Sequence, residues 1–208
     1  VFFGRMEERK GIFTFLDALD LIQAELKAQS IKVSFLGPHT SINGVHSADM
    51  IRRRSKAWSF DFKIIGGLPH RDALAFLAMP GRLAVMASPE DNSPCTIYEA
   101  MELGIPFIAA SGGGIPELVN NANHASVLFE PDAPALASRL RQALAVTPPI
   151  PKPAFSQDDI RSQWRDHHNA DGWGPWSQSN VHFYVAGQLL NDPYFVAGVD
   201  GAQRAHTM

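Results

Sequence analysis

Short apolar runs alternate along this chain with longer segments in which apolar residues recur every three or four positions. Each short run is bounded by glycine, proline or polar residues, which is typical of a strand buried inside a parallel sheet. The runs predict six strands, at residues 1–3, 31–36, 62–65, 83–87, 105–109 and 126–129. The longer segments predict helices at residues 12–26, 50–58, 69–79, 94–103 and 132–145, with a further helix that begins near residue 116. This alternation predicts the α/β class, with a doubly wound, Rossmann-like parallel sheet of about six strands.

The Rossmann-like domain is expected to end near residue 146. A proline-rich stretch at residues 148–153 predicts a linker, a helix is predicted at residues 158–168, and the remainder has no clear periodicity. We therefore expect a domain at residues 1–146, followed by a linker and an irregular tail at residues 147–208. The sequence opens in a strand-like VFFG without Met, which predicts a piece of a longer protein.

The composition of the chain excludes several classes of partner and site. The formal net charge of −3 gives no reason to expect nucleic acid. The single cysteine, Cys95, excludes an internal disulfide and a cysteine metal cluster. No segment resembles a signal peptide, and no apolar run approaches the roughly twenty residues of a membrane span. These features predict a cytoplasmic protein without a transmembrane segment, and they leave peripheral attachment to a membrane open.

The stretch at residues 87–118 carries the candidate chemistry. Asp91, Asn92 and Ser93 fall between the end of a predicted strand and the start of a predicted helix, whose inward face we assign to Ile97, Met101 and Leu103. At that position backbone N–H groups are unpaired and the helix dipole favours an anion. In an open α/β sheet this edge is also where ligands bind.

Glu99 follows Asp91 by eight residues and lies early in the same helix. Two carboxylates that face one crevice suit hydrogen bonds from sugar hydroxyls. The alternative is structural, because acidic residues near a helix start commonly act only as capping groups. Arg5 and Lys10 flank the first strand-to-helix turn. The alternative to a binding role for them is that both are simply solvated cations.

Two motifs of this chain resemble one family. Glu99-Ala100-Met101, Gly104, Pro106 and the segment 113–117 resemble the donor-site signature of the group 1 retaining glycosyltransferases, the glycogen-synthase-like class with the GT-B fold. In that class the signature contains a Glu-x7-Glu element. Here the first acid is Asp91, and the glycine that follows it three residues later in the family is Pro94.

The second motif lies at the start of the chain. Gly4-Arg5-x4-Lys10-Gly11 is similar to the family element whose Arg and Lys bind the donor diphosphate. A cationic pair suits this task, because the leaving group of glycosyl transfer is a nucleoside diphosphate whose developing charge must be neutralised.

The resemblance implies the C-terminal, donor-binding half of a GT-B enzyme that transfers a sugar from a nucleotide-diphosphate sugar with retention. It assigns the diphosphate to Arg5 and Lys10, the ribose hydroxyls to Glu99, and a donor-sugar hydroxyl to Asp91. These four are the expected catalytic residues. The expected donor-binding residues are Gly4, Arg5, Lys10, Asn92, Ser93, Pro94, Cys95, Thr96 and Glu99.

The resemblance also implies what else the enzyme needs. No metal or cofactor is expected to be essential, and the acceptor is expected to be a glycan or a lipid-linked glycan. The acceptor site belongs to an N-terminal domain that this sequence lacks, so the isolated chain is expected to bind donor weakly and to transfer nothing.

Three alternatives stay open from the sequence. The first is a non-catalytic module that binds nucleotide sugars, and the second is a nucleotide-sugar epimerase of the same fold. The third is a nicotinamide-dependent oxidoreductase. The last is disfavoured because the glycines at 112–114 do not follow the Gly-x-Gly-x-x-Gly spacing, and no acid ends a strand about twenty residues on.

Overall fold

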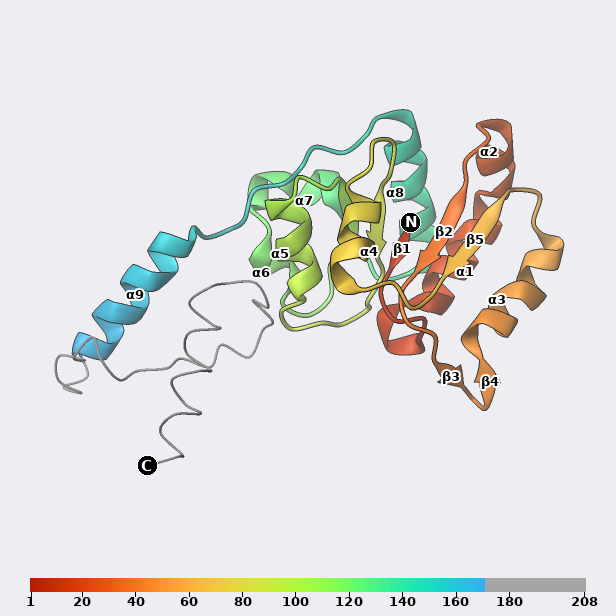
Figure 1. Ribbon diagram of the computed structural model, residues 1–208. Helices are drawn as coiled ribbons and strands as arrows, with labels where there is room; N and C mark the ends of the chain where they lie inside the picture. Colours follow the sequence, from red (N-terminus) through yellow and green to blue (C-terminus); the bar gives the residue numbers. More distant parts are fainter. Residues whose placement is uncertain (171–208) are drawn as a thin grey trace, which may run out of the picture. The chain divides into compact units, whose positions relative to one another are not determined.

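The computed structural model describes residues 1–170 (Figure 1), so most of the expected irregular tail lies outside the described residues. Residues 1–154 form one compact unit, and a second unit begins at Phe155. The second unit contains helix α9 (Gln157–Ala170), which confirms the helix expected near residues 158–168.

The compact unit is built on a parallel sheet of six strands. They are β1 (Phe2–Phe3), β2 (Val33–Leu36), β5 (Phe62–Ile65), β6 (Ala84–Met86), β7 (Phe107–Ala110) and β8 (Leu128–Phe129). Their order across the sheet is β5-β2-β1-β6-β7-β8, and every neighbouring pair is parallel. Counted along the chain, this is the order 3-2-1-4-5-6 of a doubly wound Rossmann sheet, which confirms the predicted fold class.

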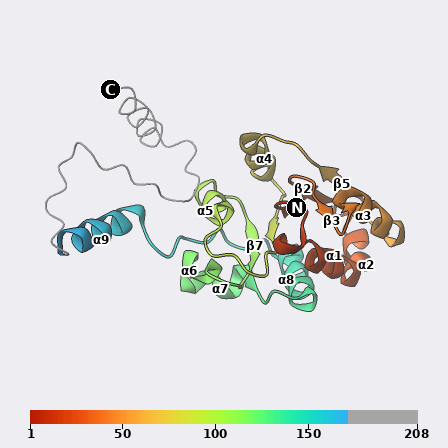
Figure 2. The same ribbon diagram turned by 90° about the horizontal axis from the view of Figure 1, so that it is seen from below.

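Helices cover both faces of this sheet. Helices α1 (Ile12–Leu21), α3 (Ser47–Arg54) and α8 (Ala133–Ala145) bury their apolar residues in one core cluster. Helices α4 (His70–Leu77) and α5 (Cys95–Glu102) pack in a second cluster on the opposite face. Figure 2 shows α4 and α5 on one side and α1 and α8 on the other. Adjacent strand residues alternate between the clusters, with Val85 in the first and Met86 in the second, as the two-residue repeat of a strand requires.

Strand β1 is short, and three phenylalanines hold it in the first core cluster. The ring centroids of Phe2 and Phe15 lie 5.4 Å apart, and those of Phe15 and Phe35 lie 5.6 Å apart. All three side chains are fully buried, and burial of each contributes about 1.5–3 kcal/mol. This packing fixes the point at which the chain leaves the sheet at Gly4.

The sequence pattern predicts no helix or strand for residues 39–49, only a loop, and that prediction is wrong. They contain a hairpin of strands β3 (Ser41–Ile42) and β4 (Val45–His46), and α3 begins at Ser47. Asn43 and Gly44 form its turn with φ of 50° and 77°. An Asn-Gly pair favours this two-residue turn because both residues tolerate positive φ.

Several predicted bounds also differ from the structure. The first helix is interrupted at Ile22, where φ is −122°, and continues as α2 (Gln23–Ala28). Residues 126 and 127, predicted as part of a strand, are the last two residues of helix α7 (Asn121–Val127). Asn120 caps the start of this helix by accepting a hydrogen bond from the N–H of Ala122. The predicted inward position of Leu103 is wrong, since Leu103 lies beyond α5 and is 52% exposed.

Short elements complete the described chain. They are the 3₁₀ turns η1 (Glu8–Lys10) and η2 (Ser55–Ala57) and helix α6 (Ile115–Leu118). None of the helices within residues 1–170 combines the length and the hydrophobicity that crossing a membrane requires.

The proline-rich stretch after α8 packs against the compact unit. The N–H of Ala154 donates to the carbonyl of Leu118 over 2.9 Å, and the N–H of Asn120 donates to the carbonyl of Lys152 over 2.9 Å. These bonds extend the compact unit to Ala154.

Candidate functional site

The strand order places two loops side by side at the carboxyl edge of the sheet. Strands β1 and β6 are neighbours, and they are the pair at which the strand order reverses. The loop after β1 holds residues 4–11, and the loop after β6 holds residues 87–94. Ligands of doubly wound sheets bind in the crevice at this reversal.

Gly11 presses the first loop against the end of β6. Its φ is 74°, and an added Cβ would lie 1.8 Å from the carbonyl oxygen of Ala87. Only glycine fits both the backbone conformation and the space. This contact explains why η1, which carries Lys10, ends beside the second loop.

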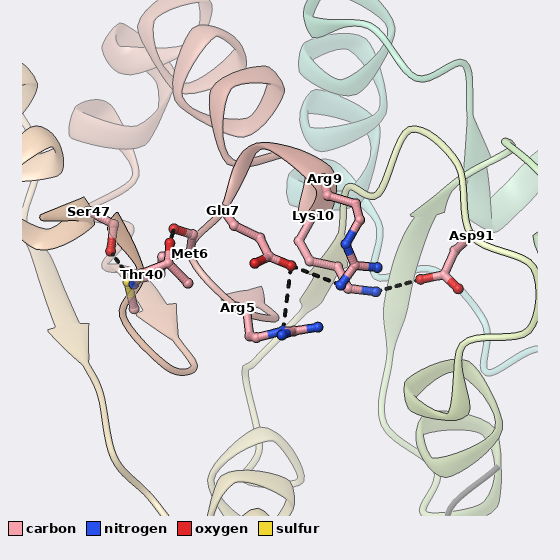
Figure 3. Close-up of polar contacts among 8 residues, drawn as sticks. All are labelled: Arg5, Met6, Glu7, Arg9, Lys10, Thr40, Ser47 and Asp91. Carbon is pink, nitrogen blue, oxygen red and sulfur yellow. Dashed lines mark hydrogen bonds and ion pairs between the residues drawn. The ribbon is translucent and has the colours of Figure 1, made fainter. Parts of the chain in front are cut away.

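Lys10 and Asp91 form an ion pair across the two loops. Lys10 Nζ lies 2.5 Å from Asp91 Oδ2, and the side chains are only 22% and 16% exposed (Figure 3). Partial burial strengthens such a pair by lowering the effective dielectric around it. The structure therefore brings together two of the four residues that were assigned to catalysis.

Arg5 lies in the first loop with a different partner. Its Nε lies 3.5 Å from Glu7 Oε1, and the same oxygen accepts a 2.9 Å hydrogen bond from Arg9 (Figure 3). The Arg5 side chain is 53% exposed, so most of its guanidinium faces solvent. No role was predicted for Glu7, which is the shared acceptor of these two arginines.

The second loop leads into the N-terminus of α5. Asn92 and Ser93 are exposed, and Pro94 precedes the first helical residue. Within the described residues, no carbonyl oxygen accepts from the N–H groups of Cys95 and Thr96. Free N–H groups at a helix start are an anion-binding arrangement.

Three glycines support the acidic loop from behind. Added Cβ atoms at Gly112, Gly113 and Gly114 would lie 1.7, 2.5 and 2.1 Å from the carbonyl oxygens of Pro89, Asp91 and Asn92. The N–H of Gly114 also donates to the carbonyl of Asp91 over 2.9 Å. The loop at 111–114 therefore fits against the backbone of the loop that carries Asp91.

Glu99 does not join the Lys10–Asp91 pair. Glu99 Oε1 is hydrogen-bonded to His70 Nε2 over 2.8 Å, and His70 is the first residue of α4. The second oxygen, Oε2, is buried without a hydrogen-bond partner among the described residues. A buried acceptor left unpaired costs about 1–3 kcal/mol, so a donor group on a ligand is favoured there.

His70 is the site residue that sequence reasoning did not assign. Its bond to Glu99 joins positions 29 residues apart. Nothing in their spacing predicts it, because the contact depends on α4 and α5 sharing one face of the sheet.

His39 borders the first loop from the β2 side. Residues Met6 and His39 form a parallel bridge, and the His39 ring occupies the space where a Cβ of Gly66 would lie. The pKa of His39 is lowered by partial desolvation of this exposed ring and then by the positive charges of the nearby His46 and Arg52. Among the side chains that the structure describes, no group of three or more His, Cys, Asp or Glu is arranged to hold a metal ion.

A family and a curated relative match this chain. A family described as "Glycosyl transferases group 1" matches residues 1–145. The chain is 28% identical over 144 residues to a protein of Salmonella typhimurium that is named as a colanic acid biosynthesis glycosyltransferase, WcaL. That match covers 67% of this chain and 34% of WcaL. The chain therefore spans about a third of the length of this relative.

Solved structures show the same fold. The C-terminal domain of the group 1 glycosyl transferase LpcC from Francisella tularensis has a TM-score of 0.54 and 19% identity, over 69% of this chain and 73% of that one. HepE of Anabaena, solved in complex with UDP, has a TM-score of 0.52 and 22% identity, over 69% of this chain and 38% of that one.

Proposed function

Because the chain belongs to the group 1 glycosyl transferases, we propose that residues 1–146 form the nucleotide-sugar donor-binding domain of a retaining glycosyltransferase. The fold is that of a GT-B glycosyltransferase domain, as in the C-terminal domain from Francisella tularensis. Family membership also argues against the oxidoreductase alternative. The observation that carries the proposal is the Lys10–Asp91 contact of 2.5 Å at the reversal of strand order.

The donor diphosphate would bind between the two loops. Arg5 and Lys10 supply cations, and the N–H groups of Cys95 and Thr96 supply neutral donors on the opposite side. Charge-assisted hydrogen bonds from such groups are about twice as strong as neutral ones. Gly4 and residues 92–94 would contribute backbone around the same anion.

The sugar and ribose hydroxyls would bind the two carboxylates. Asp91 is only 16% exposed and its carboxylate lies 2.5 Å from Lys10, so a hydroxyl of a sugar attached to a diphosphate at Lys10 suits it. Glu99 Oε2 lacks a hydrogen-bond donor in the described chain and would accept one from the ribose. The residues thus hold the two ends of one extended ligand.

Catalysis in this scheme is positioning together with stabilisation of the leaving group. As the bond to the diphosphate breaks, negative charge grows on its oxygens, where Arg5 and Lys10 oppose it. Lys10 is already held in place by Asp91, and Arg5 lies beside Glu7 in the same loop. No metal ion is needed in this scheme, because fixed cations supply the charge.

The whole enzyme would need a second domain. This chain spans 34% of the length of WcaL, and an N-terminal GT-B domain would supply the acceptor site. The acceptor would be a glycan or a lipid-linked glycan. The 208-residue chain alone is expected to bind donor weakly and to transfer nothing, and turnover by this chain would contradict that expectation.

A calorimetric titration tests the proposal. The chain is titrated with UDP, GDP, ADP and their sugars, alongside Arg5→Ala and Glu99→Ala. Arg53→Ala is the matched control, because Arg53 is an exposed cation on α3. We expect one nucleotide to bind, both site variants to lose it, and the control to keep it. A folded chain that binds none of these ligands at millimolar concentration would refute the proposal.

A further inference from the structure

A cavity of about 520 Å³ opens at the far end of the sheet, away from the Lys10–Asp91 pair. It is lined by residues of α7 and α8 and by residues at the ends of strands β7 and β8. Its polar lining residues are Ser111, His124, Glu130, Ser138, Arg139 and Gln142. The volume lies in the range of about 300–1,000 Å³ that small-molecule sites have.

Arg139 is held rigidly in the wall of this cavity. One terminal nitrogen donates to the carbonyl of Leu128 over 2.8 Å, and the other donates to Gln142 Oε1 over 2.9 Å. Its Nε is buried and has no acceptor within the described part of the chain. A buried donor without an acceptor costs about 1–3 kcal/mol, so a ligand oxygen at this point would be stabilising.

Two further groups of the lining have unused hydrogen-bonding capacity. The Glu130 side chain is exposed and forms no ion pair within residues 1–170. His124 Nε2 lies 2.8 Å from the carbonyl of Val119. A carbonyl only accepts, so Nε2 carries the proton and the other ring nitrogen of a neutral imidazole is an acceptor.

The mixture of charges decides which ligand fits. Arg139 disfavours a cation, and Glu130 disfavours an anion. A neutral molecule with many hydroxyl groups satisfies both, because each hydroxyl donates as well as accepts. Pro116 and Phe129 add apolar surface to the lining, which suits the C–H faces of a sugar ring.

We propose that this cavity binds a neutral carbohydrate of one or two sugar residues, at a second site separate from the nucleotide-sugar crevice. Ser111 lines the cavity and begins the loop whose glycines pack against the Asp91 loop. The second site does not depend on nucleotide binding at the first.

The test is a titration followed by two-dimensional ¹H–¹⁵N NMR of the 208-residue chain, in which the Arg139 Nε–H signal is observed directly. The probes are maltose, cellobiose and lactose, with inorganic phosphate as the anionic comparison. We expect at least one disaccharide to shift the Arg139 Nε–H and Ser111 amide signals saturably in the millimolar range. Phosphate should not shift them.

Two variants and a control separate binding from folding. Arg139→Met and Glu130→Gln should each lower the affinity for the disaccharide about tenfold, which corresponds to about 1.4 kcal/mol of binding free energy. If Arg139→Met fails to fold, Glu130→Gln still tests the proposal, because Glu130 is exposed and its substitution should not disturb the fold. Asp61→Asn, an exposed acid beside β5, should leave the affinity unchanged. The absence of a saturable shift, shifts confined to the Lys10 and Asp91 loops, or saturation by phosphate alone would each overturn the proposal.

Discussion

Lys10 and Asp91 lie 81 positions apart in the sequence, and their side-chain atoms meet at 2.5 Å across the two central strands of the sheet. Both residues belong to loops that leave the carboxyl edge of the sheet. The pair keeps a cation and a carboxylate aligned in the crevice before any ligand arrives.

A double-mutant cycle should measure this pairing. We expect Lys10→Met and Asp91→Asn each to lower the free energy of unfolding, with a coupling energy of about 0.5–1 kcal/mol, because the pair is partly buried. Urea denaturation of the four proteins gives the coupling. The exposed Arg52–Asp49 pair on α3 is the control and should couple more weakly. Equal coupling in the two pairs would contradict the importance of burial here.

Asp91→Asn should separate sugar binding from nucleotide binding. If Asp91 accepts from the transferred sugar, the variant loses the added affinity of a nucleotide sugar over the nucleotide alone. Affinity for the nucleotide alone should persist, because Lys10 is released from its partner. Calorimetry with both ligands measures the difference, and Glu90→Gln, one residue away and exposed, is the control. Equal losses for both ligands would show that Asp91 does not contact the sugar.

Gly11→Ala should lower the free energy of unfolding more than Gly44→Ala, although both glycines have a positive φ. Gly11 combines a φ of 74° with a carbonyl 1.8 Å from the new Cβ, so we expect a loss of about 3 kcal/mol or more. Gly44 has a φ of 77° and no atom within 4 Å, so Gly44→Ala should cost about 1–2 kcal/mol. Thermal and urea unfolding compare the two. Similar losses would show that the contact with β6 relaxes without cost.

His70→Ala should weaken nucleotide binding by acting through Glu99. Without the 2.8 Å bond to His70, Glu99 Oε1 turns toward water and the carboxylate loses its fixed orientation. We expect a several-fold loss of affinity, smaller than that of Glu99→Ala, and no further loss when both changes are combined. Calorimetry on the three variants decides this, and additive losses would assign His70 a separate role.

His39 should make stability depend on pH in a defined direction. Its pKa in the folded protein lies below the ordinary value of 6.5, so the unfolded chain binds more protons in the interval between the two values. The contribution of His39 to stability therefore rises with pH through that interval. NMR titration should show the low pKa, and Arg52→Gln should move it upward by removing a positive neighbour. An unchanged pKa in Arg52→Gln would leave burial and His46 as the causes.

The sheet was predictable because its central strands β2, β6 and β7 are buried on both faces. Runs such as residues 83–87 and 105–109 are apolar throughout, so their assignment as buried strands follows from the sequence. Residues 126 and 127 were misassigned because an apolar run does not distinguish a strand from the last turn of a helix. The Asn43-Gly44 pair is typical of a two-residue hairpin turn, and the prediction of a loop did not take it into account.

Part of the candidate site followed from its motifs, and part did not. The residues Lys10 and Asp91 were singled out from their loops, but their direct contact depends on β1 and β6 being neighbours. The pairing of Glu99 with His70 depends on how α4 and α5 pack, and no local pattern encodes it. Contacts between distant segments are set by the fold.

The glycines at 112–114 lie against the backbone of the acidic loop. The atoms nearest to a Cβ added at any of them are backbone atoms of residues 89–92, with the carbonyl oxygens of Pro89, Asp91 and Asn92 closest. The course of this loop is therefore supported from outside through its backbone, while the side chains of Glu90, Asn92 and Ser93 are exposed. The exposed side chains of such a loop can change without rebuilding its backbone, so the chemistry that the loop presents and the shape of the loop are separate properties.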